Sequence, residues 1–169
     1  MYKGNRIVVL DSSAIINGYD PSSTMLRHFI SSKAAEEIKD YNSKAKIQRA
    51  VEIGKLTVKT AKYEFIEEVK KAALETGDLH YLSEADIETL AIALECVRKG
   101  MKVVILTDDY SIQNVANHLQ IETRSVMMKG ISKKIIWIRY CPSCGATYGV
   151  ENIDECRICG SKLKRKPKA

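Results

Sequence analysis

Hydrophobic positions in the first 126 residues follow two patterns, short continuous runs and longer stretches with helical spacing. The runs at 7–10 and 102–107 predict strands that are buried on both faces, as in a parallel sheet. Shorter runs at 56–59 and 121–126 predict two further strands. Helical spacing predicts helices over 32–43, 44–54, 62–76, 83–100 and 110–119. This alternation predicts an α/β domain with a central parallel sheet flanked by helices.

Capping and turn residues divide the chain further. Ser83 and Asp86 have capping-box spacing at the start of one predicted helix, and Gly100 ends it. The stretch 127–134, with Gly130 and several lysines, has the composition of a linker. We therefore expect a domain over 1–126, a linker over 127–134, a small module over 135–164 and a basic tail over 165–169.

The small module contains four of the five cysteines, in two Cys-x-x-Cys pairs separated by eleven residues: Cys141, Cys144, Cys156 and Cys159. This spacing is typical of a zinc ribbon, in which each pair presents two sulfurs to one ion. So small a segment cannot fold by apolar burial alone, so we predict that a structural Zn²⁺ supplies most of its folding free energy. Disulfides are the alternative. Cys96 lies in an apolar helix and is expected in the core.

Positive charge is concentrated in the last quarter of the chain. The net charge is +6, and residues 127–169 hold ten Lys and Arg against three acids. Such asymmetry favours a polyanionic partner, in particular nucleic acid. The basic side chains expected to contact an RNA backbone are Lys133, Lys134, Arg139, Lys162, Lys164, Arg165 and Lys166. Tyr140, Tyr148 and Trp137 either stack on unpaired bases or fill the core of the small module.

The overall composition, 45% hydrophobic and 28% charged, is that of a folded globular chain. The longest apolar runs fall far short of the ~20 residues that a membrane-spanning helix needs. The polar N-terminus has no long apolar signal region. We therefore expect a cytoplasmic protein with no membrane partner.

Carboxylates are the candidates for chemistry, because glycine-rich nucleotide loops and a Gly-x-Ser-x-Gly motif do not occur in the sequence. Asp11, Asp108 and Asp109 follow predicted strands, at the sheet edge where α/β proteins bind ligands. Helical geometry places Glu37 and Asp86 close enough to the buried faces of their helices to reach this edge. The alternatives to a functional role are helix capping for Asp86 or Asp109 and a surface position for Glu37.

The residues that carry these acids resemble a known family. The chain is similar to the PIN (PilT N-terminal) nucleases in four places. These are the segments 8–14 (VVLDSSA), 82–86 (LSEAD) and 106–109 (LTDD), and Glu37. With the zinc ribbon and the YSIQN segment at 110–114, the chain resembles the Nob family of ribosome-biogenesis endonucleases in its short archaeal form. The resemblance implies a PIN-like fold and a four-acid metal site formed by Asp11, Glu37, Asp86 and either Asp108 or Asp109. Because Asp109 could instead cap a helix, Asp108 is the preferred fourth acid.

The resemblance also implies endonucleolytic maturation of the 3′ end of small-subunit ribosomal RNA, with the precursor of the small ribosomal subunit and its assembly factors as partners. Four converging carboxylates repel one another, and a hard divalent cation such as Mg²⁺ or Mn²⁺ relieves this repulsion. We expect Asp11 and the Asp108/Asp109 position as direct ligands, Asp86 as a direct or water-mediated ligand, and Glu37 as an outer ligand.

Two further classes of protein are alternatives to a metal-dependent ribonuclease. A haloacid-dehalogenase-like phosphatase would need a second Asp at position 13, where this chain has Ser13. A non-catalytic RNA-binding assembly factor would use only the zinc ribbon and the basic segment. A PIN toxin ribonuclease would share the acids but would have no need of the ribbon.

Overall fold

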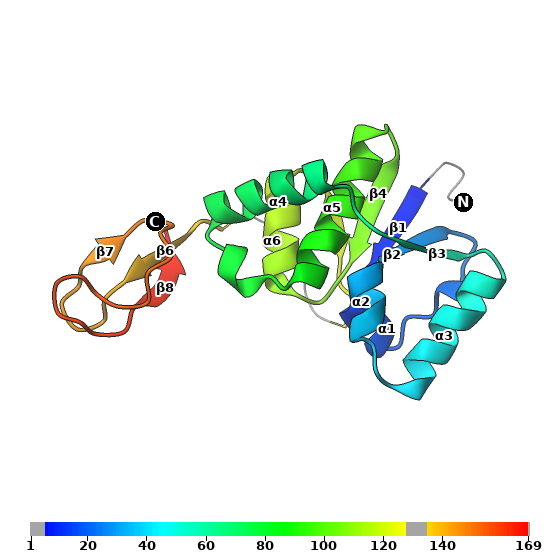
Figure 1. The fold of residues 1–169 in the computed structure, drawn as a ribbon, viewed down its shortest axis with the longest axis horizontal. Coiled ribbons are helices and arrows are strands. Elements are labelled where there is room, and N and C mark those ends of the chain that lie inside the picture. Colours follow the sequence, from blue (N-terminus) through cyan, green and yellow to red (C-terminus); the bar gives the residue numbers. More distant parts are fainter. Residues whose placement is uncertain (1–5, 128–134, 169) are drawn as a thin grey trace.

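The structure is a computed structural model that describes residues 6–127 and 135–168. Its larger part is a five-stranded parallel sheet in the order β3-β2-β1-β4-β5 (Figure 1). The strands are β1 (Arg6–Leu10), β2 (Arg27–Ser31), β3 (Leu56–Lys59), β4 (Lys102–Leu106) and β5 (Glu122–Arg124). The prediction of an α/β domain with a central parallel sheet and a small C-terminal module is confirmed.

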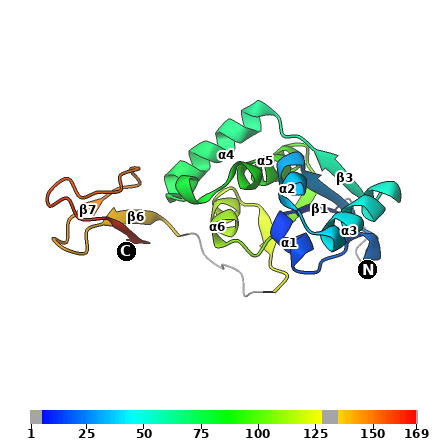
Figure 2. The same ribbon diagram turned by 60° about the horizontal axis from the view of Figure 1, so that its bottom comes forward.

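Helices cover both faces of this sheet. On one face, α4 (Tyr63–Thr76), α5 (Glu84–Arg98) and α6 (Tyr110–His118) enclose an apolar core with the alternate residues Ile7, Val9, Val103 and Ile105. On the other face, α1 (Ser12–Ile16), α2 (Ser32–Glu37) and α3 (Tyr41–Glu52) cover Val8, Leu10 and their neighbours (Figure 2). Two short 3₁₀ turns, η1 (Pro21–Ser23) and η2 (Leu79–Tyr81), complete the domain.

The structure differs from the predicted elements in the segment between β1 and β3. The strand β2 and the short helix α1 were not expected, and the expected helices over 32–43 and 44–54 are replaced by α2 and α3. The break lies at residues 38–40, because the Asp40 side chain accepts a hydrogen bond from the Ser43 backbone and starts a new helix. Glu37 is thus the last residue of a six-residue helix.

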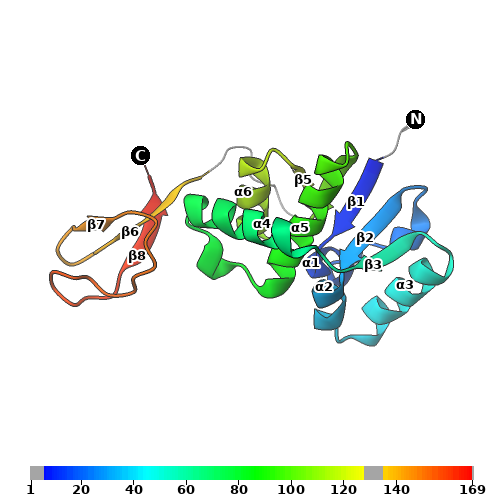
Figure 3. The same ribbon diagram turned by 45° about the horizontal axis from the view of Figure 1, so that its top comes forward.

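The C-terminal module is a three-stranded antiparallel sheet in the order β7-β6-β8, built from β6 (Trp137–Tyr140), β7 (Thr147–Tyr148) and β8 (Lys164–Pro167). It lies at the opposite end of the molecule from α3 in all three ribbon views (Figures 1 and 3). Most of the expected basic tail, 165–169, is therefore part of a strand that pairs with β6. Among the described residues, no helix is long and apolar enough to cross a membrane.

Candidate active site and metal centre

Parallel pairing brings the ends of β1 and β4 together at one sheet edge. Leu10 is paired with Leu106, and the backbone N–H of Asp11 donates to the Leu106 carbonyl at 3.1 Å. The next residues along the two strands, Asp11 and Thr107, are both buried. The Thr107 hydroxyl donates to Asp11 Oδ2 at 2.9 Å, so the two strand ends are joined by a side-chain hydrogen bond.

Thr107 also connects Asp11 to the next acid. Its Oγ1 accepts a hydrogen bond of 3.0 Å from the backbone N–H of Asp109. The Asp109 side chain caps α6, where its Oδ1 accepts the Ser111 and Ile112 N–H groups at 2.6 and 3.2 Å. Among the described residues, Oδ2 of Asp109 accepts no hydrogen bond, so capping leaves one carboxylate oxygen of Asp109 available.

Two serine hydroxyls connect Asp11 to the other acids. Ser12 Oγ lies 3.4 Å from Asp11 Oδ1 and 3.2 Å from Glu37 Oε2. Ser83 Oγ lies 3.5 Å from Glu37 Oε1 and accepts the Asp86 N–H at 3.1 Å. Through Ser12, Ser83 and Thr107, four acids from distant parts of the chain form one hydrogen-bonded cluster, which we call the acid cluster: Asp11, Glu37, Asp86 and Asp109.

Asp86 lies in an environment that disfavours its negative charge. Burial raises the pKa of the Asp86 carboxyl to about 6, against two hydrogen bonds from Ser83 that lower it. The negative charges of Asp11 and Asp109 raise this pKa further. Repulsion of this kind favours either a proton or a cation at the acid cluster.

Asp108 is placed differently. Its Oδ1 accepts hydrogen bonds from the Ser125 hydroxyl and from the Val126 and Met127 N–H groups, the last two at 3.0 and 3.1 Å. Its Oδ2 accepts from the Asn17 side chain at 2.7 Å. Both oxygens therefore bind the chain segments beside the sheet. This geometry favours Asp109 over the expected Asp108 as the fourth acid.

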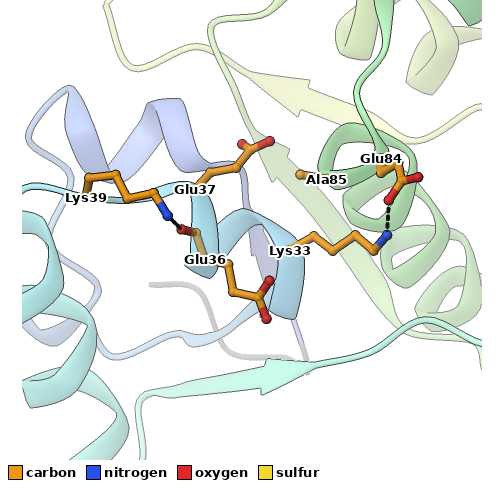
Figure 4. A pocket seen from close by; sticks show the side chains of 6 residues that line it. All are labelled: Lys33, Glu36, Glu37, Lys39, Glu84 and Ala85. Atoms are coloured by element: carbon orange, nitrogen blue, oxygen red, sulfur yellow. Dashed lines mark hydrogen bonds and ion pairs between the residues drawn. The ribbon is translucent and has the colours of Figure 1, made fainter.

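A hollow of about 460 Å³ borders the acid cluster between α2 and the start of α5. Figure 4 shows that the Glu37 carboxylate points away from that of Glu36. Lys33, which forms an ion pair with Glu84, and Lys39, which donates to the Glu36 carbonyl, line the same hollow. These two lysines were not among the residues predicted to contact RNA, which all lie in the last quarter of the chain.

The donor set fits a hard divalent cation, because it consists of carboxylate and hydroxyl oxygens. Among the described residues, three carboxylates do not come within 4.8 Å of one another; only the four module cysteines form such a group. This is compatible with Mg²⁺, which usually binds one or two carboxylates and retains several waters. The acid cluster thus offers the oxygen donors that a hard divalent cation requires.

The cysteine group has a different geometry. The Sγ atoms of Cys141, Cys144, Cys156 and Cys159 all lie within 4.8 Å of one another. The separations that join the two pairs are 3.4 Å (Cys141–Cys159) and 3.5 Å (Cys144–Cys156). Tetrahedral coordination with Zn–S bonds of ≈ 2.3 Å requires sulfurs about 3.8 Å apart, so the four thiols fit one zinc ion. Cys96 is buried in the core of the larger domain, as expected.

The basic residues expected to bind RNA are in several environments. Lys162, Lys164 and Lys166 are exposed. The Arg139 side chain is 15% exposed and lies 3.5 Å from Asp154. Arg165 is directed toward the larger domain, where it donates to Asp78, so its expected position on a free basic surface is not observed. Lys133 and Lys134 lie outside the described residues.

Comparison with known proteins agrees with the fold and the site. Residues 8–96 match the family described as PIN domain of ribonuclease. The chain therefore belongs to the class of PIN-domain nucleases. Endoribonuclease Nob1 of Methanocaldococcus jannaschii is 39% identical over 162 residues, which cover 95% of this chain and 78% of the relative. Endoribonuclease Nob1 of Methanothermobacter thermautotrophicus is 36% identical over 159 residues, which cover 94% and 91%.

The chain belongs to the Nob1 family of PIN-domain endoribonucleases, as the acid motifs and the ribbon indicated. Ribonuclease VapC1 of Thermoplasma acidophilum is also similar, at 34% identity over 94% of this chain and 77% of the relative. Each of these relatives is named as a ribonuclease. The protein is therefore an endoribonuclease, and the phosphatase and non-catalytic alternatives are not supported.

Proposed function

We propose that this protein is a divalent-metal-dependent endoribonuclease that matures the 3′ end of small-subunit ribosomal RNA. The observation that carries the proposal is the acid cluster at the edge of the sheet. Three hydroxyl groups connect its four acids, two through their carboxylates (Asp11 and Glu37) and two through their backbone N–H groups (Asp86 and Asp109). The names of the Nob1 relatives supply the enzyme class, and the zinc-ribbon module with its exposed lysines supplies a surface for a structured RNA.

Asp11, Asp86 and Asp109 would hold Mg²⁺ or Mn²⁺ through their carboxylate oxygens. When bound, such an ion supplies positive charge beside the scissile phosphate and acidifies a coordinated water. The Thr107 and Ser13 hydroxyls donate to Asp11 and fix its orientation, at 2.9 and 2.6 Å. Glu37, which receives hydrogen bonds from Ser12 and Ser83, is exposed and placed to orient the attacking water.

A structural Zn²⁺ bound by the four cysteines would fix the ribbon, and the exposed lysines of β8, with the half-buried residues of β6 beside them, would bind the RNA. Direct pairing places Ile138 opposite Lys166 and Tyr140 opposite Lys164, so these four side chains share one face. Lys166 lies 5.1 Å from the centre of the Tyr140 ring. We propose this face, which we call the ribbon face, as the RNA contact, with Lys162 and the undescribed Lys133 and Lys134 nearby in sequence.

The test is cleavage of an end-labelled RNA that spans the small-subunit 3′ end, with and without Mn²⁺. Asp11→Asn is expected to reduce the rate about 10³-fold, because it weakens metal binding that is worth several kcal/mol in the transition state. Glu37→Gln is expected to reduce the rate less, and Glu36→Gln, which changes a carboxylate on the same helix that points away, is the matched control. The proposal would be refuted if the Asp11→Asn variant cleaved the RNA at the wild-type rate, or if the wild-type protein cleaved it without a divalent ion.

A further inference from the structure

Arg165 joins the zinc-ribbon module to the nuclease domain. Its Nη1 donates to Asp78 Oδ1 at 3.2 Å. Its guanidinium lies 3.7 Å from the centre of the Tyr81 ring and 4.3 Å from that of Trp137. One cation thus contacts a carboxylate and an aromatic ring of the nuclease domain as well as the ring at the start of β6. Arginine is suited to this role because its planar group can stack and donate hydrogen bonds at the same time.

The partner of Arg165 is itself fixed within the nuclease domain. The Asp78 side chain is 1% exposed, and its Oδ2 accepts a hydrogen bond of 2.6 Å from Asn114 of α6. The Asn114 amide also donates to the Ile135 carbonyl at 2.7 Å and accepts the Ile135 N–H at 2.6 Å. A buried carboxylate without a cation is costly, so Asp78 favours the docked position of Arg165.

The backbone at Gly77 is shaped for the same contact. Gly77 ends α4 in the left-handed region, at φ +77°, which favours glycine. A Cβ atom at this position would lie 2.7 Å from the Trp137 carbonyl oxygen. Even a methyl group would therefore push the first residue of β6 away. We call these residues together the docking contact: Gly77, Asp78, Tyr81, Asn114, Ile135, Trp137 and Arg165.

The docking contact shares its secondary structure with the acid cluster. Asp109 caps α6, and Asn114 lies in the same helix five positions later. Tyr81 ends η2, and Ser83 and Asp86 open α5 directly afterwards. The ribbon is thus attached to α6, which Asp109 caps, and to η2, which directly precedes the helix that carries Asp86. Because helices are stiff over this length, docking fixes the place of the ribbon relative to the acids.

The ribbon face remains accessible while the module is docked. Arg139 and Arg165 are paired across β6 and β8, and Trp137 is paired with Pro167, so these side chains share the face that carries the docking contact. Lys164 and Lys166 alternate with Arg165 along β8 and belong to the other face, and both are exposed.

We propose that the docking contact selects the phosphodiester bond that is cut, by holding the ribbon face at a fixed distance from the acid cluster. This inference rests on the proposed function. RNA held on a fixed ribbon face presents a restricted set of phosphates to the acids, whereas RNA held on a loose ribbon presents many at a lower effective concentration. Arg165 and Asp78 are then positioning residues, not RNA ligands.

The experiment compares Asp78→Ala, Arg165→Gln and Lys164→Gln in the full-length, zinc-loaded protein. Trp137 is the only tryptophan in the chain, so its fluorescence reports docking directly. In Asp78→Ala and Arg165→Gln, we expect a red-shifted emission and a larger radius of gyration in X-ray scattering. On the RNA that spans the small-subunit 3′ end, the ratio of cuts at the principal position to cuts elsewhere should fall about tenfold. On a short unstructured oligonucleotide, both variants should cut at the wild-type rate.

Lys164→Gln is the matched control, because it removes one positive charge from the neighbouring residue of the same strand. It should weaken RNA binding without changing the Trp137 emission or the ratio of cuts. Asp78→Ala removes a negative charge, so a loss of RNA affinity cannot explain a spread of cuts in this variant. Zinc content and circular dichroism verify that each variant is folded.

The outcomes separate this inference from the proposed function. If the wild-type protein cuts neither RNA with Mn²⁺, the proposed function fails and the inference fails with it. If the wild-type protein cuts, but Asp78→Ala and Arg165→Gln release Trp137 and keep the wild-type ratio of cuts, only the inference fails. An unchanged emission and radius in both variants would also overturn it, since the named contacts would then not hold the ribbon.

Discussion

Asp86→Asn tests the acid cluster without any catalytic assay. The pKa of Asp86 is raised from 3.8 to about 6, mainly by burial and further by Asp11 and Asp109. In the metal-free protein, the folded state therefore holds this proton more tightly than the unfolded chain does. Folding stability should consequently fall as the pH rises from 3.8 to about 6, and then remain constant. Asparagine is neutral and can still accept the hydrogen bond that the Ser83 N–H donates to Asp86 at 2.7 Å.

The magnitude follows from the pKa shift, since one pKa unit corresponds to 1.36 kcal/mol. The raised pKa of Asp86 should cost at most about 1.5 kcal/mol at pH 5 and at most about 3 kcal/mol at pH 7.5 in the absence of Mg²⁺ and Mn²⁺, because solvent screens this half-buried group. Asp86→Asn should therefore be the more stable protein, and its advantage should double over this range. Adding Mn²⁺ should stabilise the wild-type protein by mass action and reduce the advantage.

Urea denaturation at several pH values, in buffers freed of Mg²⁺ and Mn²⁺ but with the zinc retained, measures this difference. Glu84→Gln is the control, because Glu84 lies in the same helical turn but its pKa is lowered by Lys33. That substitution should give no gain at high pH. A stability difference between wild type and Asp86→Asn that is independent of pH, or of the opposite sign at pH 7.5, would refute the electrostatic account of the acid cluster.

Three further predictions concern the metal and the core. Cys141→Ser should lower the zinc content and expose the module to protease while the circular dichroism of the nuclease domain persists, because structural zinc contributes about 10 kcal/mol; a protease-resistant module without zinc would contradict this. Burial lowers the pKa of His28. Its contribution to folding stability is therefore fully present above pH 6.5 and is lost as the pH falls below that value. Urea denaturation of His28→Asn at several pH values should show a weaker loss of stability at low pH. Glu88 accepts hydrogen bonds from Ser32, Lys33 and Ala61, so Glu88→Ala should cost about 3 kcal/mol in urea denaturation, and a loss below ~1 kcal/mol would be inconsistent with these bonds.

The sequence predicted those elements whose local signals agree with their burial. The helix over 83–100 has a capping box and is observed as α5, and the apolar run at 102–107 is observed as β4. The strand β2 was missed because its buried positions include polar residues. His28 is 1% exposed and is satisfied by Tyr19 and by the Lys55 carbonyl, and the Ser31 hydroxyl caps α2. A hydrophobicity pattern cannot identify a strand whose polar residues find their partners only after folding.

The position of the acid cluster could be predicted from the sequence in part. Residues at the ends of neighbouring parallel strands must meet, so Asp11 and the 108–109 pair were assigned to one sheet edge from the sequence alone. The hydroxyl groups that join the acids were not identified as a set, although Ser12, Ser83 and Thr107 each lie near an acid in the sequence. Their common role depends on contacts such as that between Ser12 and Glu37, which are 25 residues apart.

The choice between Asp108 and Asp109 shows why capping was a poor criterion. Asp108 was preferred because Asp109 could cap a helix, yet a cap requires only one carboxylate oxygen, and here Oδ1 receives both backbone N–H groups. The charge of the Asp109 carboxylate raises the pKa of Asp86. Asp108 has no capping role, but both of its oxygens bind the chain around Asn17 and Val126. Asp108 and Asp109 are therefore distinguished by the partners of their oxygens, which depend on tertiary contacts and not on position in a motif.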